Sequence, residues 1–192
     1  MGENGKYTVN EIRLLVREDP DYRILRKEQF VSTVFTKENP LNQLLFDEMI
    51  GWYGTYEKTS SCQTSALINS YAYNLTEGIT GQEILNVFCG ENNNLIYYDG
   101  SPKSSLNDIS VAIAKEKKLD KYIHVGNKKN STNVWGNAGV ITGLVEKGKN
   151  IDSHFVFQVQ DLILDSLPAD RPAAKKYIEH SHIPLYWRKL EK

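Results

Sequence analysis

The chain has 192 residues, 40% of them hydrophobic, and this length and apolar fraction predict a single domain over residues 1–192 with a sizeable core. Its 23 basic and 24 acidic side chains give a formal net charge of −1, which argues against a nucleic-acid partner because phosphate backbones attract strongly basic surfaces. No run reaches the roughly 20 apolar residues that cross a bilayer, and the first residues lack the apolar core of a signal peptide, so we expect a cytoplasmic protein with no membrane partner.

The N-terminal region is charged and predicts helices over residues 9–17, 27–35 and 40–50. In the third segment, apolar side chains recur at spacings of three and four, as in a helix that packs on a core. We expect residues 1–50 to form a helical extension packed on a core of residues 51–168, and its charged surface could also dock a partner protein.

Three further helices are predicted in the middle of the chain. The first starts near Cys62, which follows three hydroxyl residues typical of a helix start. The second starts near Thr80, because Glu83 stands at the third position of a capping box. The third covers residues 105–118.

Beyond residue 120, short β-like runs replace the helical periodicity and predict a small antiparallel sheet. These runs cover residues 122–125, 140–145, 154–159 and 162–164. Residues 169–192 are expected to form a C-terminal helix, at 173–180, and an aromatic tail that packs back on the domain. Trp135 and Asn137 are interpreted as loop residues, and the alternative is that they line a substrate groove. The fold class is therefore α+β.

Cys62 is the candidate nucleophile. A thiol in the first turn of a helix lies near backbone N–H groups and the positive end of the helix dipole, which favour the reactive thiolate. Packing in the core is the alternative for Cys62, and it is the expected role of Cys89, which ends an apolar helix. No group of His, Cys, Asp or Glu has the spacing of a metal site, so we expect no metal and no cofactor.

His154 is the strongest candidate for the base that such a nucleophile needs, because it follows a polar turn and opens the apolar run at residues 155–159. If residues 160–161 form a two-residue hairpin turn, His154 and Asp165 become diagonal neighbours on one face, with Cβ atoms on the order of 7 Å apart. Asp165 could then hold the imidazole. A three-residue turn would move Asp165 to the opposite face.

Other residues remain open for these roles. His124 is an alternative base, although no acid follows it at strand spacing. Asp152 and Asp161 are alternative orienting acids. His180 and His182 lie in a charged stretch, where solvent exposure is the expected state.

Three segments carry a resemblance to a known family. Residues 61–71, Ser-Cys-Gln-Thr-Ser-Ala-Leu-Ile-Asn-Ser-Tyr, are similar to the nucleophile helix of papain-like cysteine peptidases, in particular those that process double-glycine-leader bacteriocins. Residues 153–159 resemble the family's histidine strand, and residues 163–168 resemble the strand end that carries its Asp. The resemblance covers about residues 53–168, and the order Cys, His, Asp along the chain is that of the family.

The resemblance implies a papain-like fold in which Cys62 attacks, His154 is base and acid, and Asp165 orients His154. The implied function is hydrolysis of an amide or peptide bond through a thioester, with a peptide, peptidoglycan or protein as the substrate. The family usually holds the oxyanion with a Gln about six positions before the Cys, and here that position is Tyr56. The hydroxyl of Tyr56, or of Tyr53 beside it, could donate the same hydrogen bond.

A second hypothesis comes from the departures from the family pattern, which are the missing Gln and the presence of Gln63 where the family has Gly. The chain could be an inactive papain-like domain that serves as a structural or interaction protein of a phage or a larger bacterial assembly.

Overall fold

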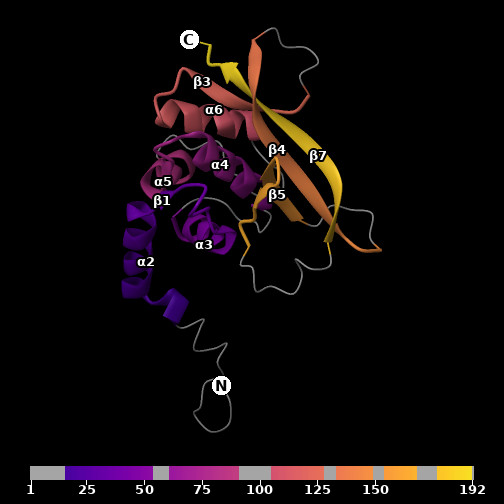
Figure 1. The fold of residues 1–192 in the computed structure, drawn as a ribbon. Coiled ribbons are helices and arrows are strands. Elements are labelled where there is room, and N and C mark those ends of the chain that lie inside the picture. The colour runs from indigo at the N-terminus through magenta and orange to yellow at the C-terminus, as the bar shows by residue number, and fades with distance from the viewer. Residues whose placement is uncertain are drawn as a thin grey trace.

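The structure is a computed structural model, and it describes residues 16–53, 61–90, 105–127, 133–148, 154–167 and 177–191. These residues form a mixed helix-and-sheet fold with a two-stranded antiparallel sheet, in the order β1-β2, and a five-stranded one, in the order β3-β7-β4-β5-β6. The helices gather on one side of the large sheet, and α2 lies farthest from it (Figure 1). The expected α+β class is therefore correct.

The described N-terminal elements are α2 (Pro20–Ser32), β1 (Val34–Phe35) and α3 (Gln43–Tyr53). Asp19 caps α2, because its side chain accepts hydrogen bonds from the backbone N–H groups of the first turn. The helix expected over residues 27–35 is wrong at both ends, since α2 already begins at Pro20 and residues 34–35 pair with β2 (Ile79–Thr80) as a short strand. The pairing partner lies far away in the sequence, which is why local periodicity did not indicate it.

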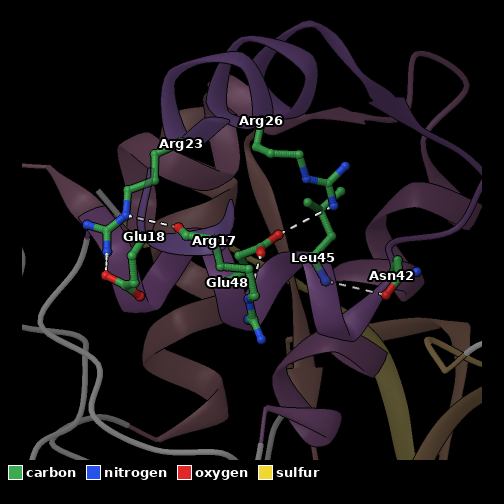
Figure 2. Close-up of polar contacts among 7 residues, drawn as sticks. All are labelled: Arg17, Glu18, Arg23, Arg26, Asn42, Leu45 and Glu48. Carbon is green, nitrogen blue, oxygen red and sulfur yellow. Dashed lines mark hydrogen bonds and ion pairs between the residues drawn. The ribbon is translucent and has the colours of Figure 1, made fainter. Parts of the chain in front are cut away.

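A buried carboxylate joins α2 to α3 (Figure 2). Glu48 on α3 accepts from Nε of Arg17 at 3.2 Å and from Nη2 of Arg26 at 3.4 Å, and only 7% of its side chain is exposed. Arg23 completes this charged layer by donating to Glu18 and to the carbonyl of Arg17. These contacts fasten α2 and the residues before it to α3.

The central helices are α4 (Cys62–Asn74), α5 (Gly81–Cys89) and α6 (Leu106–Glu116). The start of α5 has the predicted capping box of Thr80 and Glu83, and Ser105 forms a second one on α6. Nearly every side chain of α4 is buried. The first residue of α4 is therefore held in the interior of the protein, where the helix cannot shift without disturbing the core.

The hydroxyl of Tyr71 fixes α4 to its neighbours. It accepts a hydrogen bond from the N–H of Ile123 at 3.0 Å and donates to the carbonyl of Ser110 at 2.9 Å, with all three residues buried. One side chain on α4 therefore satisfies polar groups of both α6 and β3.

The five strands of the large sheet are β3 (Lys121–Val125), β4 (Val134–Glu146), β5 (His154–Val159), β6 (Leu162–Leu164) and β7 (Tyr177–Lys189). β5 and β6 have the predicted bounds. β4 begins earlier than expected, so the interpretation of Trp135 and Asn137 as loop residues is wrong. The pairing of β4 is shifted on both sides of Asn137, and Gly139 has a φ of +109°. These irregularities hide the strand period from sequence inspection.

The C-terminal helix expected at residues 173–180 is wrong over its described part, because residues 177–180 begin β7. β7 lies between β3 and β4 in the sheet. Trp187 near its end is buried in the core and packs edge-on against Tyr71, with ring centroids 6.0 Å apart. The aromatic tail therefore packs on the domain as expected, but it does so as a central strand.

Over the described ranges, no helix has the length and apolar character required to cross a bilayer. The same ranges contain no group of three or more His, Cys, Asp or Glu side chains arranged to hold a metal ion.

Candidate active site

Cys62 is the first residue of α4 and is buried, with 6% of its surface exposed. Ser61 precedes the helix and makes no capping hydrogen bond with its side chain. One face of α4 packs on β5, where the rings of Tyr73 and Phe157 lie 5.6 Å apart. The thiol, at the first residue of α4, therefore lies near the start of β5.

The β5–β6 hairpin has the register that the sequence predicted. Val159 pairs with Leu162 across a two-residue turn in which Gln160 has a φ of 51°, and Phe157 pairs with Leu164. Asp165 follows directly after the last paired residue. Because side chains alternate along a strand, this register brings Asp165 to the face of the hairpin that carries His154.

His154 and Asp165 are in direct contact. Nε2 of His154 donates to Oδ1 of Asp165 at 2.7 Å, and the same oxygen accepts from the N–H of Leu167 at 2.9 Å. His154 is buried, with 4% of its surface exposed, whereas the Asp165 side chain is 30% exposed. The carboxylate is thus held by the N–H of Leu167, and it orients the imidazole of His154.

Cys62 is the second partner of this imidazole, since the two side chains are hydrogen-bonded. Asp165 occupies Nε2, so Nδ1 is the ring nitrogen left for the thiol. Burial by itself would lower the pKa of His154, but the hydrogen bonds and negative charges of Asp165 and Cys62 outweigh it and raise that pKa to about 9. The imidazole is therefore held in its charged form at neutral pH.

The proposed oxyanion donor Tyr56 lies outside the described residues. Its alternative, Tyr53, uses its hydroxyl to donate to the carbonyl of Arg23 at 3.0 Å, which ties α3 to α2. The hydroxyl of Tyr53 is therefore used in a structural hydrogen bond between helices and not at the thiol.

Cys89 and the other candidates do not join this cluster. Burial raises the pKa of the Cys89 thiol to about 11, despite an opposing effect of Lys27, and its side chain packs against the core. A raised pKa is the opposite of what a nucleophile needs.

His124 lies on β3, and β7 and β4 separate it from the strand of His154. Burial and the charge of Arg188 lower its pKa. His182 is exposed on β7 and pairs with Glu179 at 3.2 Å, Asp161 is exposed in the β5–β6 turn, and Asp152 lies outside the described residues.

Sequence inspection missed a second layer of polar residues around the site. The N–H of Gln43, at the start of α3, donates to the carbonyl of Ser166 at 2.7 Å, directly after Asp165. The carboxyl of Asp47, one turn further along α3, lies beside the side chains of Gln43 and Ser61. Gln43 and Asp47 are four residues apart, which places them on one helix face, but nothing in the local sequence indicates what that face contacts.

Comparisons with protein-family models, with curated proteins and with solved structures give no match to this chain.

Proposed function

We propose that this protein is a cysteine hydrolase with a papain-like α+β fold, which cleaves an amide or peptide bond through a thioester intermediate. The observation that carries the proposal is that one imidazole contacts both a thiol at a helix start and a carboxylate. His154 bonds Asp165 through Nε2 and is also hydrogen-bonded to Cys62. Nucleophile, base and orienting group in mutual contact are what covalent catalysis requires.

The papain-like fold is supported by the order and setting of these residues. Cys62 opens a buried helix, His154 opens a strand of an antiparallel sheet, and Asp165 follows the next strand. This is the arrangement that the resemblance implies.

In the proposed reaction, the Cys62 thiolate attacks the carbonyl carbon of the substrate, and the electron pair of the C=O bond moves to oxygen. The N–H of Cys62, with the hydroxyl of Tyr56, would donate to that oxyanion. His154 then gives its proton to the leaving nitrogen as the C–N bond breaks, which releases the amine and leaves a thioester on Cys62.

Deacylation reverses these roles. Water loses a proton to the neutral His154 and attacks the thioester, the carboxylic acid leaves, and Cys62 returns as thiolate beside an imidazolium. Asp165 keeps the ring oriented in both half-reactions. The substrate class proposed is a peptide, a protein or a peptidoglycan cross-link.

Alkylation by iodoacetamide as a function of pH tests the proposal without a known substrate. We expect Cys62 to react with a midpoint well below the ordinary thiol pKa of about 8.5, because a neighbouring imidazolium stabilises the thiolate. Cys89 is the internal control, and peptide mapping separates the two sites. His154→Ala should raise the midpoint for Cys62 alone.

A wild-type midpoint at the ordinary value for Cys62 would contradict the proposal. That result would favour the inactive papain-like scaffold as the description of this protein.

A further inference from the structure

The start of α3 contacts both sides of the candidate active site. On one side, the N–H of Gln43 donates to the carbonyl of Ser166 at 2.7 Å, and the hydroxyl of Ser166 donates to Oε1 of Gln43 at 3.3 Å. Both residues are buried. Ser166 is the neighbour of Asp165, so these two bonds fix the backbone that carries the orienting carboxylate.

On the other side, the carboxyl of Asp47 lies between Gln43 and Ser61. Burial raises the pKa of Asp47, and the side chains of Ser61 and Gln43 partly oppose that rise. The hydroxyl of Ser61 and Oδ1 of Asp47 are both buried without a hydrogen bond, so the approach of Ser61 to the carboxyl is a polar contact. Ser61 is fully buried and immediately precedes Cys62.

These contacts close a ring around the site. From Cys62 the ring passes through His154 to Asp165 by hydrogen bonds, and the chain then leads to Ser166. It continues through the side chain of Gln43 to the carboxyl of Asp47 and on to Ser61 by polar contacts that lack hydrogen-bond geometry, and so returns to Cys62. Gln43 is the member with direct contacts on both sides, because it reaches Ser166 and Asp47 at once.

We infer that Gln43 is a positioning residue for the proposed reaction, which holds the Asp165 backbone and the start of α4 at the spacing that lets His154 contact both Cys62 and Asp165. The inference rests on the proposed function. It assigns Gln43 no contact with the substrate. Its side chain acts by keeping the carboxylate and the thiol on opposite sides of one imidazole, where a small displacement weakens one of the two hydrogen bonds.

Gln43→Met tests the part of this role that belongs to the side chain, because Met has a similar volume but lacks the amide that accepts from Ser166 and lies beside Asp47. The main-chain hydrogen bond from Gln43 to Ser166 is kept in this variant. We expect the alkylation midpoint of Cys62 to rise by about one pH unit, which corresponds to a roughly 10-fold lower rate on the acidic side of the profile. The pKa of His154, followed by NMR of the imidazole, should fall below the wild-type value in the same variant.

Tyr71→Phe is the matched control. It removes a buried hydroxyl from α4 outside the ring, so it should lower the melting temperature while leaving both titrations unchanged. If Gln43→Met lowers only the melting temperature, in the manner of Tyr71→Phe, Gln43 is a structural residue and the inference is overturned.

Ser166→Ala gives a second, smaller change that removes only the hydroxyl contact with Gln43. If Gln43→Met does not fold, a shift of the Cys62 midpoint in Ser166→Ala toward higher pH supports the inference, and an unchanged midpoint overturns it. If the wild-type alkylation midpoint of Cys62 is low and neither variant shifts it, the inference is overturned and the proposed function stands. If the wild-type midpoint has the ordinary value, the proposed function is overturned and the inference with it.

Discussion

Nε2 of His154 lies 2.7 Å from Oδ1 of Asp165, across a hairpin in which the two residues are diagonal neighbours. The separation is set by a two-residue turn between β5 and β6. One residue more or fewer in that turn would send Asp165 to the other face of the hairpin. The contact is therefore as dependent on the turn as on the two side chains.

Asp165→Asn should impair turnover far more than substrate binding. The carboxylate stabilises the imidazolium and fixes its orientation without touching the substrate, so we expect kcat to fall about 10-fold or more with little change in KM. The measurement is steady-state kinetics on a peptide amide that the wild type cleaves. The effect should be strongly non-additive with His154→Ala, because no imidazole is then left to orient. A kcat near wild type would make Asp165 a turn residue only.

The stability of the protein should depend on pH through His154. Its pKa is raised to about 9 in the folded state, against about 6.5 for an ordinary imidazole. The interactions of His154 with Asp165 and Cys62 together therefore add stability that is fully present below about pH 6.5 and is lost as the pH rises through 9, by on the order of 3 kcal/mol.

Urea unfolding of wild type and Asp165→Asn across pH 6 to 10 measures the part of this stability that depends on Asp165. The difference in the free energy of unfolding between the two proteins should shrink as the pH rises. A constant difference would show that the pair stabilises the fold independently of the charge on His154.

Asp47→Asn should stabilise the protein at neutral pH. Burial raises the pKa of Asp47 in the folded state, so the ionised carboxylate is disfavoured there relative to the unfolded chain. The penalty is absent at low pH, where the group is protonated in both states, and it grows as the pH rises through the folded pKa. Thermal melts at several pH values should show the variant gaining stability relative to wild type as the pH rises above the ordinary carboxyl pKa of about 3.9. A variant that is less stable at pH 7 would mean that the contacts of Ser61 and Gln43 outweigh burial.

Tyr71→Phe should destabilise the fold by about 1–3 kcal/mol. The substitution leaves the buried N–H of Ile123 without its acceptor and removes a donor to Ser110. Chemical denaturation measures the loss. The hydroxyl of Ser110 also lies 2.7 Å from the Tyr71 hydroxyl, so the double variant Tyr71→Phe, Ser110→Ala serves as the control and measures the coupling between the two hydroxyls. A loss near zero would indicate that water replaces the hydroxyl.

The sequence by itself determined the features that depend on neighbouring residues. The start of α4 at Cys62, the capping box of Thr80 and Glu83, and the bounds of β5 and β6 all agree with local sequence patterns, although Ser61 makes no capping hydrogen bond. The hairpin register belongs to this group, since a short turn couples the two strands directly. For that reason the contact between His154 and Asp165 could be predicted.

Tertiary structure alone decided the features that join distant segments. β7 is a central strand although Pro184 stands within it, because Pro184 lies one position beyond the last residue of β7 that pairs with β3. Its carbonyl accepts from the N–H of Gly126 on that side, so its ring nitrogen faces a place where the β3 ladder has already ended. A proline argues against a central strand when the sequence is considered alone. The contact of Gln43 with Ser166 likewise joins residues 123 positions apart. Such a hydrogen bond depends on where packing brings two backbones together, and local propensity contains no information about that position.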